Sequence, residues 1–210
     1  MLDDLDHVVS SEDELRELYP EPSERALRKE LDGLDAHCLA FIAASPFMVL
    51  ATAGADGRCD ASPRGGPAGF VKALDGRLLV PDLPGNRRLD THANVVANGH
   101  VGLLFMIPGI DETLRVNGSA VLTRDQAVLA AAEVEGRTPL LVLAVEVEQA
   151  YVHCGKALRR SELWRPEGWP DRAEVPSPAR MLRDHADRDV TVEAVEASLE
   201  EGYATRLYDW

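Results

Sequence analysis

The dipeptide Asp75-Gly76 stands between two short apolar runs, Gly69–Leu74 and Arg77–Pro81. Asp-Gly readily adopts the two positive φ angles of a type I′ turn, whose twist matches that of paired antiparallel strands. This segment therefore predicts a β-hairpin. An antiparallel sheet must then form at least part of the fold.

Further apolar runs of strand length are spread along the middle of the chain. They cover Phe47–Ala53, His100–Ile107, Thr113–Thr123 and Leu140–Val147, and Arg58–Ser62 can return antiparallel to the first of them. Together with the hairpin they make about seven short strands separated by turn signals. This pattern favours a closed or half-closed antiparallel barrel over a doubly wound parallel sheet.

Helical segments flank and interrupt the strands. Residues 11–45 are expected to be helical in pieces, since Pro20 and Pro22 break the pattern. Further helices are predicted over 87–97, 125–132, 178–186 and 191–201, while 165–180 is expected to be a loop or arm. We expect one structural domain with three parts: a helical segment (1–45), a barrel core (46–165) and a C-terminal loop and helical arm (166–210).

The charge distribution narrows the choice of partners. The net charge is −14, and residues 1–35 carry −8 and residues 187–210 carry −5, so the region between them is nearly balanced. Nucleic acids and anionic membranes bind clustered positive charge. We therefore expect neither as the main partner, and the positive charges of the central region are free to serve a local, specific role.

Several features indicate a cytoplasmic protein. No apolar run approaches the length of a transmembrane helix. The acidic N-terminus lacks the basic and then apolar pattern of a signal peptide. Cys38, Cys59 and Cys154 are widely spaced and form neither a disulfide framework nor a zinc-binding pair, which fits a reducing compartment.

The run Pro84–Asp90 is the most informative local motif. Asn86 is a plausible N-cap for the following helix, and Arg87 and Arg88 would then lie in its first turn. Cations are unfavourable at a helix N-terminus, whereas a bound anion would be held there by backbone N–H groups and guanidinium groups. A phosphate site is one interpretation. The alternative is that the arginines face water or pair with Asp82 and Asp90.

Two other runs carry cations beside glycine. In Ala61–Val71, Arg64 lies in a loop rich in glycine and proline, which either approaches a ligand closely or only connects two strands. In His153–Trp164, Lys156, Arg159 and Arg160 share one helical face. That face either meets an anion, is solvated, or pairs with the acidic end segments of the same chain or of a partner chain.

The sequence lacks the usual catalytic motifs. It has no hydrolase nucleophile elbow, no phosphate-binding P-loop, no dinucleotide-binding glycine motif and no histidine spacing typical of a metal site. His153-Cys154 is expected to be a buried structural pair, because neither catalysis nor zinc binding has further support. No catalytic side chain and no metal ligand is predicted. Any chemistry is therefore expected to come from a bound cofactor.

Taken together, four runs resemble the FMN-binding split-barrel family, the relatives of pyridoxamine 5′-phosphate oxidase. They are Ser62–Gly65 with Gly69–Val71, Leu83–Thr91 with Asn94, Glu112–Gly118, and His153–Ser161. Their order and spacing are similar to an uncharacterised branch described as FMN-dependent enzymes. The resemblance covers roughly residues 40–165 and implies a mainly β Greek-key split barrel that forms a homodimer, with FMN between the two chains.

The resemblance also implies which residues bind the cofactor. The FMN phosphate would be held by Asn86, Arg87 and Arg88, and the cofactor would be lined by Arg64, Gly65, Phe70, Val71, Val80, Pro81 and Asn94. Thr113, Lys156 and Arg159 match contacts that the partner chain often supplies. The expected function is that of an FMN-dependent oxidoreductase, with NAD(P)H or a small molecule as its reaction partner.

The chain departs from pyridoxamine phosphate oxidase where that enzyme binds its substrate. The run Ser-Arg-Pro-x-x-Ser-Gln is absent, and so is the C-terminal Arg-Leu-x-Pro. The oxidation of vitamin B6 is therefore not predicted. Two alternatives stay open: a protein that binds or stores a flavin, deazaflavin or haem without turnover, and a dimeric scaffold with an empty cleft.

Overall fold

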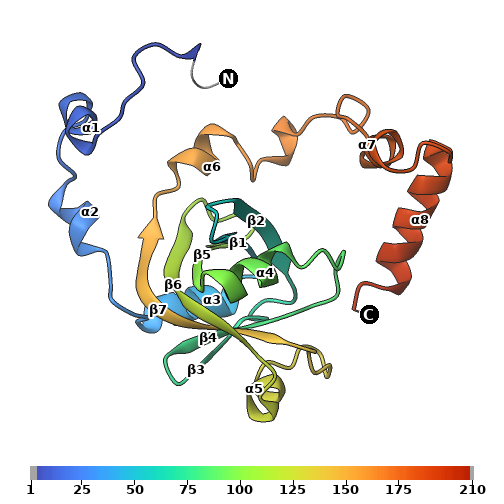
Figure 1. Ribbon diagram of the computed structural model, residues 1–210, viewed down its shortest axis with the longest axis horizontal. Coiled ribbons are helices and arrows are strands. Elements are labelled where there is room, and N and C mark those ends of the chain that lie inside the picture. The colour runs from blue at the N-terminus through green and yellow to red at the C-terminus, as the bar shows by residue number, and fades with distance from the viewer. Residues whose placement is uncertain (1–3, 209–210) are drawn as a thin grey trace.

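The computed structural model describes residues 4–208 and contains one strongly bent antiparallel sheet (Figure 1). Its strands are β1 (Phe47–Ala53), β2 (Cys59–Gly65), β3 (Lys72–Leu74), β4 (Arg77–Pro81), β5 (His100–Met106), β6 (Thr113–Thr123) and β7 (Val142–His153). Their order in the sheet is β2-β1-β5-β6-β7-β4-β3. This is the predicted antiparallel split barrel, with helices before and after it.

Alternation along the strands places the hydrophobic core inside the barrel. On β1, Met48 and Leu50 are fully buried, and on β5 the inward positions are Leu103 and Phe105. The residues between them, such as Val49, point outward and are half-buried. Because neighbouring side chains of a strand point to opposite faces, the sheet has an inner core face and an outer face.

The predicted hairpin is confirmed. Asp75 and Gly76 both have positive φ angles, 51° and 79°, as a type I′ turn requires. Its first strand, however, begins at Lys72 and not at Gly69. The Phe70 N–H bonds to the carbonyl of Pro67 and the Gly69 N–H to that of Ser45, so residues 66–70 form a turn beside β1 instead of a strand.

Two strands are longer than predicted. β7 runs to His153 because it pairs with β6 along its whole length, across an irregularity at Asn117/Gly118. The sequence hides this extension, since its outward positions are polar. β2 likewise continues to Gly65, which pairs with Phe47.

Three helices pack near the barrel: α3 (Ala36–Ala44), α4 (Asp90–Ala97) and α5 (Gln126–Ala131). Figure 1 shows α3 and α4 against the sheet. The Asp35 side chain caps α3 by accepting from the Cys38 N–H at 2.8 Å. Cys38 and Ile42 of α3 then join the core.

The remaining helices form two arms that leave the barrel. The N-terminal arm contains α1 (Glu12–Leu18) and α2 (Glu24–Arg28); the C-terminal arm contains α6 (Lys156–Arg160), the 3₁₀ turn η2 (Pro166–Gly168), α7 (Pro178–His185) and α8 (Val192–Thr205). Figure 1 shows the arms on opposite sides of the barrel. Within residues 4–208, no helix is both long and apolar enough to cross a membrane.

Candidate functional site

A cleft of about 460 Å³ opens beside β2, the end of β4 and the first turn of α4. This volume lies within the range of small-molecule sites, about 300–1,000 Å³. Its lining residues all come from one stretch of the chain: Asp60, Ser62–Gly65, Phe70 and Pro81–His92. Phe70, Pro81 and Leu83 give the cleft an apolar wall, and three arginines give it positive charge.

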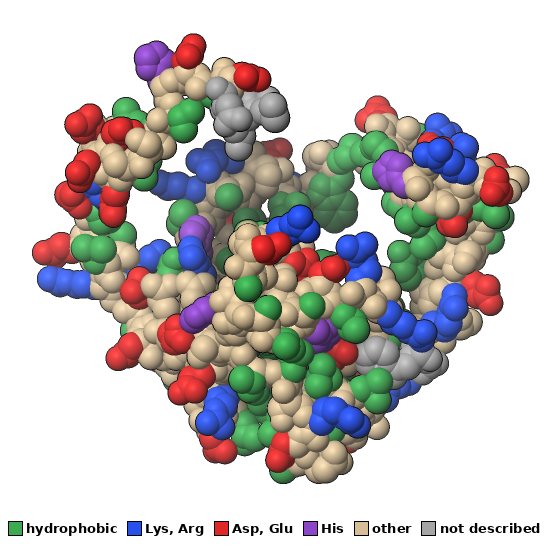
Figure 2. Space-filling model, viewed as in Figure 1, with side chains coloured by type: hydrophobic (Ala, Val, Ile, Leu, Met, Phe, Trp, Pro, Cys, Tyr) green, Lys and Arg blue, Asp and Glu red, His purple; other side chains and the backbone are tan. Residues whose placement is uncertain are grey.

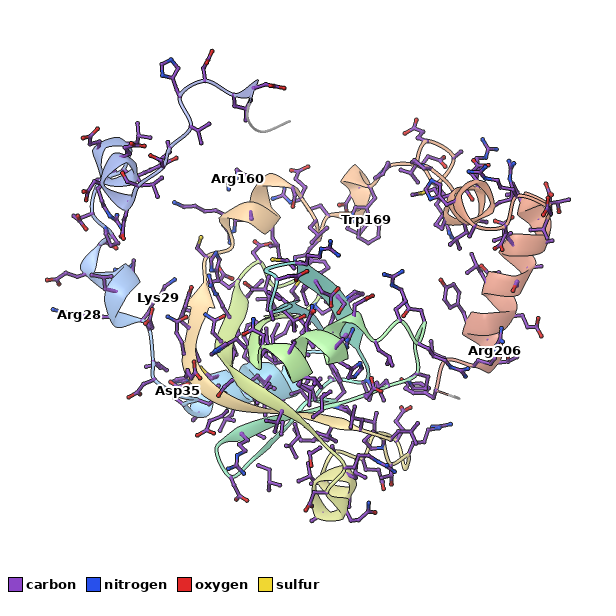
Figure 3. All side chains as sticks on the ribbon, viewed as in Figure 1. Arg28, Lys29, Asp35, Arg160, Trp169 and Arg206 are labelled. Carbon is purple, nitrogen blue, oxygen red and sulfur yellow. The ribbon has the colours of Figure 1, made fainter. Side chains whose placement is uncertain are left out.

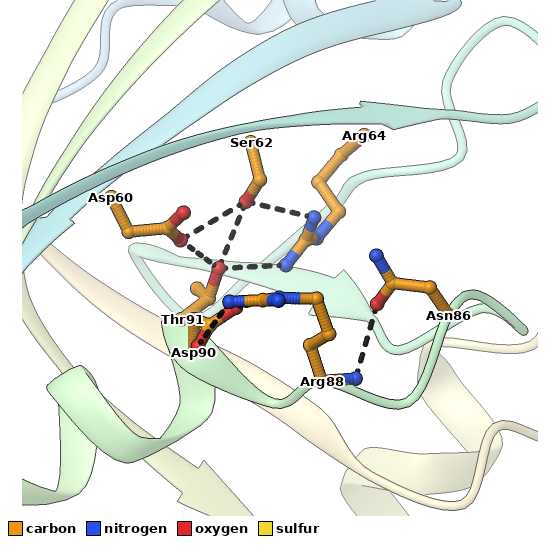
Figure 4. A network of polar contacts seen from close by, with 7 residues as sticks. All are labelled: Asp60, Ser62, Arg64, Asn86, Arg88, Asp90 and Thr91. Carbon is orange, nitrogen blue, oxygen red and sulfur yellow. Dashed lines mark hydrogen bonds and ion pairs between the residues drawn. The ribbon is translucent and has the colours of Figure 1, made fainter. Parts of the chain in front are cut away.

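A polar network inside the cleft joins β2 to α4 (Figure 4). Arg64 donates to the hydroxyls of Ser62 and Thr91, at 3.0 and 3.1 Å, and to the carbonyl of Pro63. The Thr91 hydroxyl in turn donates to the Asp60 carboxylate and lies 2.8 Å from the Ser62 hydroxyl. The network holds the Arg64 guanidinium in one orientation at the cleft wall.

Arg64 is a partly desolvated cation. Burial lowers its pKa below the ordinary arginine value, and the charges of Asp82 and Asp60 oppose that effect. A guanidinium stays protonated at neutral pH even so. An anion bound in the cleft would therefore meet a fixed positive charge that bulk water screens only weakly.

The loop before α4 differs from the predicted helix start. The helix begins at Asp90, not at Arg87, and Asn86 is not its N-cap. The Asn86 side chain instead accepts from the Arg88 N–H at 3.1 Å. Leu89 precedes the helix in the left-handed conformation, at φ 63°, and Arg87 is also left-handed at φ 59°. These two reversals turn the chain before it can become helical.

The two loop arginines are in different electrostatic states. Arg88 pairs with Asp90, with Nε and Oδ2 2.7 Å apart, and this hydrogen bond holds the pKa of Arg88 above its ordinary value. Arg87 has no ion pair within residues 4–208. Arg88 thus forms the pair with Asp90 that one of the two interpretations expected. Arg87 remains a free cation at the cleft.

A family model for pyridoxamine 5′-phosphate oxidase matches residues 34–154, more than half of the chain. The chain belongs to this family. The matched region begins just before α3, ends one residue after β7, and includes the whole cleft. Both terminal arms lie almost entirely outside it. A search of the curated proteins gave no match.

Solved structures to which the chain is similar include three proteins of low sequence identity. HupZ from Group A Streptococcus is 17% identical, with 57% of this chain and 93% of that chain covered and a TM-score of 0.47. A putative pyridoxamine 5′-phosphate oxidase from Lactobacillus delbrueckii is 20% identical, with 59% of this chain and 98% of that chain covered and a TM-score of 0.45. HutZ, the haem storage protein from Vibrio cholerae, is 12% identical, with 57% of this chain and 94% of that chain covered and a TM-score of 0.38.

Seven of the predicted cofactor residues line the cleft: Arg64, Gly65, Phe70, Pro81, Asn86, Arg87 and Arg88. Val80 lies just beneath it, against a small cavity that shares Arg64 and Pro81 with the cleft. Val71 is buried in the core. Asn94 donates to the Thr52 hydroxyl at 3.0 Å and so ties α4 to β1 rather than facing the cleft.

Thr113, Lys156 and Arg159 do not line the cleft of their own chain. Thr113 is buried at the start of β6, and Arg159 pairs with Asp111 at 2.8 Å. Gly155 is needed here, because a Cβ would lie 2.7 Å from the Asp111 side chain. These residues reach a cofactor only if it belongs to another copy of the chain.

His153 and Cys154 are exposed, so the prediction of a buried structural pair is wrong. The β7 strand ends there, and the chain turns outward into α6. Within the described residues, no group of three His, Cys, Asp or Glu side chains could hold a metal ion.

The sequence did not single out Asp60, Thr91 or His92 as residues of the cleft. Asp60 and Thr91 anchor Arg64, and His92 Nε2 lies 3.3 Å from Asp82 Oδ1 with both side chains 18% exposed. Only their contacts across the fold distinguish these residues from ordinary surface groups. The chemistry of the cleft nevertheless suits FMN: arginines for a phosphate, and an apolar wall for an aromatic ring.

Proposed function

We propose that this protein is a homodimeric FMN-dependent oxidoreductase. The observation that carries the proposal is the convergence of Arg64, Arg87 and Arg88 on a cleft that also has an apolar wall. A phosphate monoester carries up to two negative charges, and guanidinium groups bind it in a bidentate manner. FMN, when bound, supplies hydride and electron transfer at its isoalloxazine ring.

Each part of the cleft has a distinct task in this proposal. Arg87 and Arg88 bind the phosphate. To do so, Arg88 gives up one of its contacts with Asp90 and donates to a phosphate oxygen instead. Arg64 is positioned by Thr91 and Ser62 to donate to a polar edge of the cofactor. Phe70 and Pro81 pack against the ring and exclude water. No side chain is assigned as an acid or base.

The proposed dimer is supported by the outer face of the sheet. Phe47, Val49, Leu104 and Met106 lie on it as neighbours across β1 and β5, and all are only half-buried in the single chain. In such a dimer we propose that Thr113, Lys156 and Arg159 contact the cofactor of the other chain, as the family resemblance implies. We propose that residues 46–165 form this dimeric core.

The visible absorbance spectrum of the purified protein, before and after addition of FMN and then NADPH, tests the cofactor and the chemistry. We expect a flavin band that bleaches with a suitable electron donor. A flavin band that no donor bleaches would assign the protein a role in binding or storage, without turnover. The absence of any flavin uptake would refute the cofactor.

A double variant tests the phosphate site. Arg87→Ala with Arg88→Ala should weaken FMN binding by about 100-fold, because two charge-assisted contacts are lost. Arg172→Ala with Arg188→Ala removes the same charge from the C-terminal arm and should leave the affinity unchanged. Equal affinities for both double variants would contradict the phosphate assignment.

A further inference from the structure

Within residues 4–208, nothing covers the N-terminal arm. Every residue from position 4 to 28 is exposed, and neither α1 nor α2 buries a side chain. Both helices are nevertheless capped, by Ser11 and Ser23. The arm carries seven exposed large apolar residues: Leu5, Val8, Val9, Leu15, Leu18, Tyr19 and Leu27.

Such an arm needs a partner surface. Isolated helices of five and seven residues are marginal in water, and helices in proteins are stabilised mostly by packing of an apolar face. The arm also exposes seven large apolar side chains, more than an arm of this length needs if it stays in water. The arm is therefore expected to lie on a surface that is absent from the single chain.

A basic ridge beside the root of the arm offers such a surface. It consists of Lys29, Arg115, Lys156 and Arg160, and runs from the α2 end across β6 and β7 to α6. Lys29 and Arg115 both lie over the Tyr151 ring, at 4.9 and 5.7 Å. None of the four cations has an ion pair within residues 4–208.

Figure 2 shows positive side chains gathered between the barrel and the N-terminal arm, and Figure 3 places Lys29 and Arg160 on that side. The arm and the ridge are complementary in charge. Residues 4–24 contain eight acidic residues and one arginine. The ridge is positive in a chain whose net charge is −14. Patches of opposite charge steer association and fix its register.

The position of the ridge favours a second copy as the source of the arm. Arg115 pairs in register with Leu104 of β5, and Leu104 with Val49 of β1, so the ridge borders the outer apolar face. The arm leaves the barrel at the same border, where Leu31 and Ala150 form a β-bridge. A two-fold axis near this border would place each arm beside the other chain's ridge, since a twofold interface is reciprocal.

We propose that the acidic N-terminal arm of one chain docks on the basic ridge of a second copy. The exchange is mutual, so each arm contacts the other chain and both arms stabilise the dimer. This inference rests on the proposed dimer but not on the FMN assignment.

Complementary charge reversals test the exchange. One chain carries Asp13→Lys and Glu17→Lys in the arm, and the other carries Arg115→Glu and Arg160→Glu in the ridge. Each variant alone is expected to self-associate at least about tenfold more weakly than the wild type at low salt, because like charges then face each other. When mixed, the two variants should form a heterodimer well above its statistical share, since both of its arm contacts are again complementary.

Native mass spectrometry and sedimentation give the readout, and FMN content is measured on the same samples. Glu196→Lys with Glu200→Lys, on α8, is the matched control and should associate like the wild type. A monomeric wild type would overturn the inference, as would unchanged association of the arm variant. Weakened variants that do not recover on mixing would place the arm on its own chain's ridge and would overturn it too.

Discussion

Arg64 on β2 donates through Nη2 to the Thr91 hydroxyl on α4 at 3.1 Å, although 27 residues separate the two in the chain. Thr91 is only 5% exposed, and its hydroxyl also serves Asp60 and Ser62. One buried hydroxyl thus fixes a cation and a carboxylate at the same wall of the cleft.

Replacement of Thr91 by Val should destabilise the protein. The variant keeps the shape of the side chain but removes the hydroxyl that Asp60, Ser62 and Arg64 share. These partners are half-buried and keep their other bonds, so the expected loss is about 1 kcal/mol. Denaturant unfolding with and without FMN measures the loss, and Thr91→Ser, which keeps the hydroxyl, is the control. If Thr91→Val unfolds like the wild type, the network has no structural role.

Asp90→Asn should strengthen FMN binding. Asp90 competes with a bound phosphate for Arg88, since its carboxylate accepts from Arg88 Nε at 2.7 Å. The pair is exposed, and solvent screening keeps such pairs weak. The gain in affinity is therefore expected to stay within about fivefold. Titration calorimetry measures it. When Arg88→Ala is already present, the further change Asp90→Asn should no longer alter the affinity.

Leu89→Gly should stabilise the folded chain. Leu89 is 58% exposed and left-handed, at φ 63°. This conformation costs roughly 1–2 kcal/mol for a residue with a Cβ and little for glycine, although glycine loses more entropy on folding. A net gain of up to about 1 kcal/mol is expected in thermal unfolding. Leu89→Ala keeps the Cβ and should show no gain; equal gains in both variants would contradict the strain argument.

Asp35 should make the free energy of unfolding depend on pH in the acidic range. The backbone N–H of Cys38 holds the pKa of the Asp35 carboxyl below its ordinary value. The unfolded chain therefore takes up this proton first as the pH falls, and the stability from the cap is lost as the pH drops through the lowered pKa. Above the ordinary pKa the contribution is complete.

Asp35→Asn keeps an acceptor at the cap without a charge. Its free energy of unfolding should fall less than that of the wild type between neutral pH and about pH 3. Urea unfolding at a series of pH values checks this. Parallel curves for the two proteins would show that Asp35 is not linked to acid unfolding.

Local sequence patterns were sufficient to predict the strands and the hairpin. The apolar runs of strand length at Phe47–Ala53 and His100–Met106, and the Asp75-Gly76 turn, depend only on neighbours in the chain. The extension of β7 beyond Val147 could not be predicted in this way, because the polar residues Glu148 and Gln149 end the apolar run, and the strand continues only through its pairing with β6.

The start of α4 shows how far the residues of the cleft can be predicted from the sequence. Asn86 followed by polar residues fits an N-cap in sequence, yet two left-handed residues and the Arg88–Asp90 pair delay the helix to Asp90. Arg64, Arg87 and Arg88 were identified from their residue types. Asp60, Thr91 and His92 can be recognised as cleft residues only from the contacts between β2, β4 and α4, and no local sequence pattern predicts those contacts.

All the residues that line the cleft fall between Asp60 and His92, a single uninterrupted part of the chain. Most binding pockets assemble from distant segments, so that ligand preference changes only through scattered substitutions. In this protein one continuous segment supplies all of the lining residues. Exchange of residues 60–92 for those of a relative would therefore replace every side chain that lines the cleft within one chain and leave the rest of the barrel unchanged.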